Sequence, residues 1–87
     1  MKVTNNSNGD IQVAISRWGD NDQKASFFTL KRGEDGNWSR SDSKGFLMAI
    51  SSNYPTTNGT YFIKSTSNID VGTNQVSRDG TTINKLQ

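Results

Sequence analysis

The side chains that most catalytic centres need are missing from this chain of 87 residues. It contains no histidine and no cysteine, which removes the usual bases, the thiol nucleophile and the usual zinc ligands. Its acidic residues lie mostly beside Gly, Asn or Ser, where their ordinary role is to form turns. We therefore expect no enzyme activity, no catalytic residue, no metal site and no cofactor.

Two tryptophans carry chemistry that fits sugar recognition. Each stands beside a turn, in Arg17-Trp18-Gly19-Asp20 and in Gly36-Asn37-Trp38-Ser39-Arg40. A flat ring stacks on the apolar face of a pyranose while neighbouring polar groups bind its hydroxyls. Alternatively, either ring caps the core or packs at a subunit interface. The predicted ligand-binding residues are Trp18, Asp20, Asn21, Trp38, Arg40 and Tyr54.

Tyr54 belongs to this set because it lies in a stretch rich in turn-forming residues, Asn53–Gly59. In such a loop, its ring is placed to contact a sugar or a lipid headgroup. The alternative is that the ring closes one end of the fold.

Short β-strands must hold these side chains, because apolar residues alternate along the chain. Ile11, Val13 and Ile15 alternate with polar or small residues, which is the two-residue period of a half-buried strand. Further strands are predicted at 26–30, 45–50 and 60–64, with turn-forming residues at 32–37 and 53–59 between them. We predict one all-β domain over residues 1–87, a small antiparallel β-sandwich of about six to eight short strands. The predicted inner face includes Val13, Ile15, Phe28, Leu30, Phe46, Met48 and Ile50.

Two short loops predict β-hairpins. Asp79-Gly80 stands between two short alternating segments, a strong signal for a two-residue turn. Near the start, a three-residue loop of Ser7-Asn8-Gly9 would place Val3 opposite Val13, with the apolar residues of both strands on one face.

The composition predicts a thin core and a partner subunit. Only 30% of the residues are hydrophobic, and a domain of this size buries about 60% of its unfolded surface. Without cysteine for disulfides, oligomerisation is the expected reinforcement, so we predict a homodimer or larger homo-oligomer. The net charge of +2 is spread along the chain without a basic run, and no nucleic-acid partner is expected.

The chain carries no pattern for membrane insertion or classical export. No apolar run is long enough to span a membrane, and polar residues follow Met1 directly, without a signal-peptide pattern. We expect a cytoplasmic or non-classically secreted protein. For such a chain, the glycosylation sequons at Asn5, Asn37 and Asn58 have no meaning.

A recurring layout runs through the first half of the chain, in the segments Val3–Val13, Trp18-Gly19, Phe28–Glu34 and Arg40–Asp42. It resembles the first half of the aegerolysins, a family of small fungal β-sandwich proteins, and more loosely other compact lectins and cytolysins. The resemblance implies a small protein, cytosolic or exported without a signal, that binds membrane lipids. Aegerolysins are longer and richer in aromatic residues, and the second half of this chain has no clear counterpart in them.

Among binding functions, the composition favours glycans. Ser, Thr and Asn are abundant and suit hydrogen bonding to hydroxyl-rich ligands, and small mushroom lectins share this composition and the lack of Cys and signal. We predict a carbohydrate-binding, lectin-like module whose shallow sites act together in an oligomer, with cell-surface glycans as partners. The alternatives are a membrane-lipid-binding cytolysin, similar to the aegerolysins, and a protein-binding effector.

Overall fold

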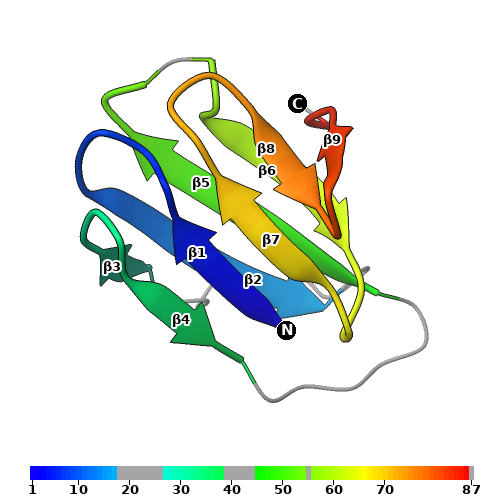
Figure 1. Cartoon of the computed structure of the whole chain (residues 1–87). Coiled ribbons are helices and arrows are strands. Elements are labelled where there is room, and N and C mark those ends of the chain that lie inside the picture. The colour runs from blue at the N-terminus through cyan, green and yellow to red at the C-terminus, as the bar shows by residue number, and fades with distance from the viewer. Residues whose placement is uncertain (18–26, 39–44, 55, 87) are drawn as a thin grey trace.

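Every regular element in the described residues is a β-strand. The computed structural model describes residues 1–17, 27–38, 45–54 and 56–86. Their strands form two layers (Figure 1), which confirms the predicted small all-β sandwich. The strands are β1 (Lys2–Asn5), β2 (Ile11–Arg17), β3 (Phe28–Leu30), β4 (Asp35–Asn37), β5 (Phe46–Ser52), β6 (Gly59–Ile63), β7 (Asn68–Val71), β8 (Val76–Arg78) and β9 (Thr81–Ile83).

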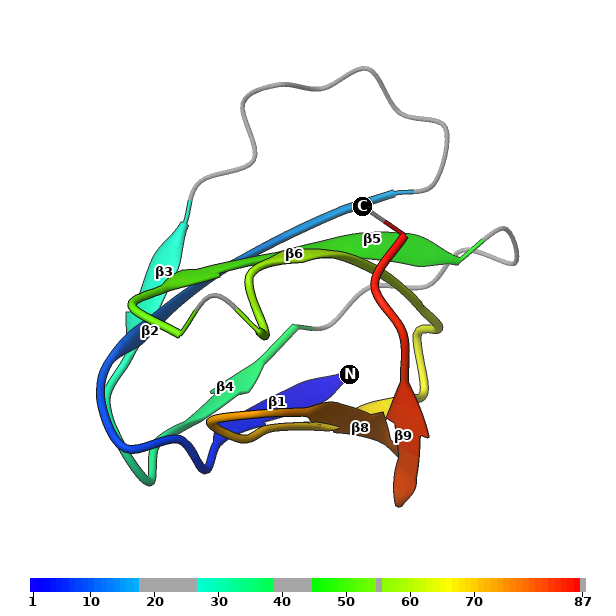
Figure 2. The same ribbon diagram turned by 90° about the horizontal axis from the view of Figure 1, so that it is seen from above.

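The two sheets differ in strand direction. One sheet has the order β4-β1-β7-β8-β9, and the other has the order β3-β2-β5-β6. Among the described strands, pairing is antiparallel except between β1 and β7, which run parallel with Val3 opposite Ile69. Parallel neighbours need a long connection. Here the connection contains the whole second sheet, which Figure 2 shows as a separate layer.

One hydrophobic core lies between the layers, and both sheets contribute to it. Six of the seven predicted inner residues are buried, but the prediction for Phe28 is wrong, because its side chain is 55% exposed on an edge strand. The core also contains residues outside the predicted inner-face set. These are Val3, Ile11, Trp38, Tyr61, Ile63, Ile69, Val71 and Val76.

The hairpin predicted at Asp79-Gly80 is confirmed. β8 pairs with β9 antiparallel, with Arg78 opposite Thr81. Asp79 has a φ of 51° and Gly80 a φ of 87°, as a two-residue turn of type I′ requires. Asp79 also fastens this turn to β7, since its carboxylate accepts a 2.9 Å hydrogen bond from the Asn68 N–H.

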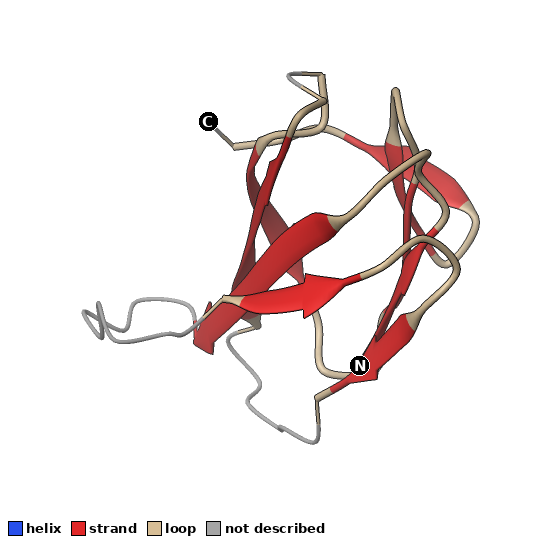
Figure 3. Cartoon of the chain, turned by 90° about the vertical axis from the view of Figure 1, so that its left-hand side faces the viewer, coloured by secondary structure: helices blue, strands red, loops and turns tan. Residues whose placement is uncertain are grey.

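The hairpin predicted at Ser7-Asn8-Gly9 is wrong. β1 and β2 belong to different sheets, so this loop crosses from one layer to the other. Figure 3 shows such loops, in tan, joining the layers of strands, in red. Val3 and Val13 do both face the core, but from opposite layers, because alternation specifies a buried face and leaves the pairing partner open.

Candidate functional site

The sandwich opens along one side, between β3 and β4. These strands are joined by a tight turn in which the Glu34 N–H donates to the Lys31 carbonyl at 2.9 Å and the Lys31 N–H donates to the Glu34 carboxylate at 2.7 Å. Despite this short link they enter different sheets, β3 beside β2 and β4 beside β1. Figure 2 shows the two strands diverging from their common turn. The side chains between them are therefore at the margin of the core.

Trp38 follows β4 and occupies this margin. Its side chain is 9% exposed and belongs to the core cluster, so the structure favours the core alternative for this ring. Gly36 makes the placement possible, because a Cβ there would lie 2.7 Å from the indole carbons Cη2 and Cζ3 and 3.3 Å from Leu30. The backbone of Trp38 is held by Met1, whose carbonyl accepts from the Trp38 N–H at 2.9 Å.

Two hollows flank Trp38, and both are lined by Asn37 and Trp38. We call the first the polar hollow; it has a volume of about 450 Å³ and is lined by Met1, Lys2, Asn37, Trp38, Ser65, Thr66, Ser67 and Asn68. We call the second the apolar hollow; it has a volume of about 270 Å³ and is lined by Phe28, Thr29, Leu30, Gly36, Asn37 and Trp38. Binding sites for small ligands usually have volumes of about 300–1,000 Å³. The polar hollow lies within this range, and the apolar hollow is slightly smaller.

The polar hollow gathers carboxamide and hydroxyl side chains. Asn37 and Asn68 lie on either side of Lys2, their register partner in β1, and Ser65 and Thr66 come from the loop after β6. Within the described part of the chain, no hydrogen bond is made by the side chains of Asn37, Asn68, Ser65 or Thr66. A carboxamide both donates and accepts, so these groups suit a ligand whose hydroxyls do the same.

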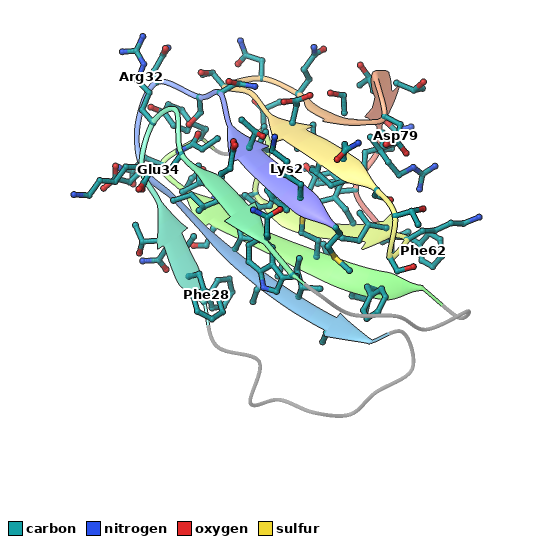
Figure 4. All side chains as sticks on the ribbon, turned by 60° about the horizontal axis from the view of Figure 1, so that its bottom comes forward. Lys2, Phe28, Arg32, Glu34, Phe62 and Asp79 are labelled. Atoms are coloured by element: carbon teal, nitrogen blue, oxygen red, sulfur yellow. The ribbon has the colours of Figure 1, made fainter. Side chains whose placement is uncertain are left out.

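Among the described residues, three charged groups lie at or beside the polar hollow: the N-terminal ammonium of Met1, the Lys2 ammonium and the Asp35 carboxylate. Lys2, which Figure 4 labels on β1, places its Nζ 3.4 Å from the Asp35 carboxylate, and both side chains are about half exposed. A hydrogen bond from the Thr4 side chain, with a smaller contribution from Lys2, lowers the pKa of Asp35 below 3.8. Asp35 is therefore ionised at neutral pH and offsets the ammonium charge of Lys2. The N-terminal ammonium of Met1, which donates to the Trp38 carbonyl at 2.8 Å, adds a positive charge that Asp35 does not offset.

The apolar hollow presents aromatic carbon to solvent. Phe28 meets Trp38 edge to face, with the ring centroids 6.0 Å apart and the ring planes at 77°. Figure 4 shows Phe28 on β3, at the margin of the ribbon. The buried Leu30 and the bare backbone of Gly36 complete the wall. No lining residue of this hollow carries a charge.

The predicted site residues do not come together in the described structure. Trp18, Asp20, Asn21 and Arg40 lie outside the described residues and stay predictions. Tyr54 is described, but it lies at the other end of β1 from Trp38. Its hydroxyl oxygen is 2.9 Å from the position that a Cβ on Gly9 would take, and its side chain is half-buried. The structure thus favours the alternative in which Tyr54 closes that end.

The comparisons with known proteins do not assign a function to the chain, so the proposed function is based on the geometry of the described residues. No family model, curated protein or solved structure matches the chain. In the described ranges, no three His, Cys, Asp or Glu side chains form a group that could hold a metal ion. No helix in those ranges is long and apolar enough to cross a membrane. Ser41 and Lys44 have the Ser-x-x-Lys spacing found in some enzymes with a serine nucleophile. Both residues lie outside the described ranges.

The sequence indicated only part of the two hollows. Asn37 was adjacent to a predicted site residue, but Phe28 was expected in the core. Asn68, Ser65 and Thr66 carry no local signal, because they reach the polar hollow only through the parallel pairing of β7 with β1. A pattern of alternating residues cannot indicate a neighbour more than 60 positions away in the chain.

Proposed function

We propose that this protein is a carbohydrate-binding module and that its site is the polar hollow beside Trp38. The observation that carries the proposal is the gathering of two carboxamides and three hydroxyls around an open hollow of about 450 Å³ that Trp38 also lines. Protein sites for neutral sugars need such groups, because each sugar hydroxyl donates one hydrogen bond and accepts others.

The experiment begins with a glycan array, followed by calorimetric titration of the sugars that bind. Replacing Asn37 or Asn68 by Ala removes one carboxamide from the hollow. Each variant is expected to weaken binding about fivefold, the effect of losing roughly one hydrogen bond. Asn74→Ala is the matched control, since Asn74 is an exposed asparagine of the β7–β8 loop and does not line the hollow.

Two results would contradict the proposal. One is the absence of binding to every glycan and simple sugar at millimolar concentration. The other is wild-type affinity in both Asn37→Ala and Asn68→Ala while a glycan still binds, which would move the site elsewhere. In the second case, Trp18, Asp20, Asn21 and Arg40 become the residues to replace.

A second candidate function is binding to membrane lipid, and one observation favours it. Phe27 and Phe28 are consecutive and are 50% and 55% exposed, which is typical of side chains that enter a membrane interface. Leakage from liposomes without glycans would support this candidate. A protein that neither binds glycans nor causes leakage would instead fit a protein-binding effector.

A further inference from the structure

We propose that the ligand is an amphipathic glycoconjugate, a sugar that carries an apolar substituent, and that the apolar hollow binds this substituent. The inference rests on the proposed function, because the sugar itself is assigned to the polar hollow. It adds the chemical class of the group attached to that sugar.

The two hollows are adjacent, because they share two lining residues. Both are lined by Asn37 and Trp38, so a ligand that occupies one hollow lies next to residues that also line the other. The polar hollow is lined mainly by polar residues and the apolar hollow mainly by apolar ones. A substituent that extends from the sugar past Trp38 meets the Phe28 ring next, since the two rings are in edge-to-face contact at 6.0 Å.

The size and the lining of the apolar hollow fit a small apolar group. Its volume is about 270 Å³, and a protein cavity of about 150 Å³ is enough to bind benzene. Phe28, Leu30 and Trp38 supply its apolar wall, while Gly36 contributes no side chain to fill it. A phenyl ring or a short alkyl chain therefore fits, and an ionic substituent finds no partner there.

Phe28 is exposed although its position in β3 faces the core. Its inner-facing position, opposite Val13 of β2, would normally bury the ring in the core. Instead, 55% of Phe28 is accessible to water. Because β4 diverges from β3, the Trp38 ring that follows β4 covers Phe28 only in part, through the edge-to-face contact. An apolar substituent would remove this ring from water, and such burial is favourable in proportion to the area covered.

The test compares methyl, phenyl and octyl glycosides of glucose, galactose, mannose and N-acetylglucosamine by calorimetry. The phenyl or octyl glycoside of the sugar that binds is expected to bind about tenfold more tightly than its methyl glycoside, the effect of burying one small apolar group. In Phe28→Ala, this preference is expected to disappear while methyl glycoside binding is kept. In Asn68→Ala, all three glycosides are expected to weaken by a similar factor.

The neighbouring Phe27 gives the matched control. It is 50% exposed, nearly as much as Phe28, but it does not line the apolar hollow, so Phe27→Ala should keep the preference for the phenyl glycoside. The inference is overturned if wild-type protein binds the methyl and phenyl glycosides equally, or if Phe27→Ala and Phe28→Ala reduce the preference equally. In both cases sugar binding itself, and with it the proposed function, stands. Failure of every glycoside to bind overturns both.

The same chemistry occurs in soluble glycosides and in glycolipids, and a vesicle assay separates the two sources. Phosphatidylcholine vesicles with and without a glycolipid of the bound sugar are the probes. Binding that requires the glycolipid and is lost in Phe28→Ala identifies a lipid-borne ligand. Binding of the soluble phenyl glycoside without binding to these vesicles identifies a soluble glycoconjugate.

Discussion

Asn5 is a buried polar side chain whose hydrogen-bonding positions are all used. Its Nδ2 donates to the carbonyls of Gly9 and Leu30, both at 2.8 Å. Its Oδ1 accepts from the N–H and the hydroxyl of Ser7, at 2.9 and 2.6 Å. The side chain thus joins β1, the loop between the layers and the end of β3. It thereby holds the end of β3 that leads into the β3–β4 turn.

Replacing Asn5 by Ala is expected to lower the free energy of unfolding by roughly 2–4 kcal/mol. The loss is large because four hydrogen bonds are removed and the buried Leu30 carbonyl and Ser7 N–H lose this partner, although the Ser7 hydroxyl keeps its 2.9 Å hydrogen bond to the Gly9 carbonyl. Urea unfolding measures it. The neighbouring Asn6 is the control: its exposed side chain makes one 2.8 Å hydrogen bond to Asp70, so Asn6→Ala should cost less than about 1 kcal/mol. Equal losses in the two variants would contradict this role of Asn5.

Tyr61 gives the fold a dependence on alkaline pH. Its hydroxyl is buried and donates to the Thr57 carbonyl at 2.8 Å, and burial raises the pKa of Tyr61 above its usual 10.0. The folded state therefore holds this proton more tightly than the unfolded state does. The corresponding stability is complete below about pH 10 and is lost as the pH rises from there through the pKa of the folded state.

In Tyr61→Phe, the thermal midpoint is expected to fall less steeply between about pH 9 and pH 11 than in the wild-type protein. At neutral pH, the variant should lose roughly 1–2 kcal/mol, since the Thr57 carbonyl loses its donor. Calorimetric melting curves across this pH range test the expectation. A variant with the wild-type slope would show that other groups cause the alkaline loss.

At the scale of elements, β4 depends on one glycine. Gly36 faces inward opposite Val3, and the indole of Trp38 folds back over its backbone at a distance that excludes a Cβ. Glycine is usually unfavourable in a strand, and here it is required because the close approach of the indole closes the core beside β3. The turn-forming residues at 32–37 predicted a loop, but their second half pairs with β1, because burial of Trp38 outweighs the low strand propensity of Asp35-Gly36-Asn37.

Gly36→Ala is expected to cost about 1–3 kcal/mol, because the new methyl group overlaps the indole and forces it to move. Urea unfolding followed by tryptophan fluorescence measures both the stability and the displacement of the ring. The smaller ring of Trp38→Phe leaves space for the methyl group, so in that background Gly36→Ala should cost less. An unchanged cost in the Trp38→Phe background would mean that the indole is not the obstacle.

The edge strands are protected to different degrees. β6 is covered by the C-terminal segment, in which the Leu86 N–H donates to the Thr60 carbonyl at 2.7 Å and the Lys85 ammonium donates to the Asn58 carbonyl at 2.9 Å. Figure 2 shows this segment leaving β9 for the other layer. β4 carries the charge of Asp35, whereas β3 has neither charge nor cover among the described residues. The fourth edge, β9, is likewise uncharged, so β3 and β9 are the edges that are open to pairing with another strand.

For the whole molecule, self-association through β3 is the expected consequence of a thin core. The described residues span about 32 by 26 by 23 Å, a size at which natural domains often add a partner subunit. We expect sedimentation velocity at high micromolar concentration to show a homodimer. Thr29→Lys, which places a charge on the exposed face of β3, should shift the equilibrium towards the monomer. A wild-type protein that sediments only as a monomer would refute this prediction.

Local patterns in the sequence were enough to predict the fold class, the faces of its longest strands and one turn. Alternation along β2 and β5 reports burial directly, since successive side chains of a strand point to opposite faces. Asp79-Gly80 was readable for the same local reason: a type I′ turn needs two residues that tolerate positive φ, and no distant contact is involved. Trp38 was recognised as an aromatic residue beside a turn, with the core as one of its two alternatives.

Which strands became neighbours depended on the packing of the folded domain as a whole. The pairing of β1 with β7, the crossing of Ser7–Gly9 between layers and the exposure of Phe28 all depend on competition among strands that bury similar apolar faces. Alternation is the same for each such strand and therefore does not distinguish one partner from another. The two hollows arise from these pairings, because β7 brings Asn68 beside Lys2 and the divergence of β3 from β4 leaves Phe28 at the margin of the core. A surface built from segments distant in the chain is decided by the packing of the whole domain, and no local pattern of residues encodes it.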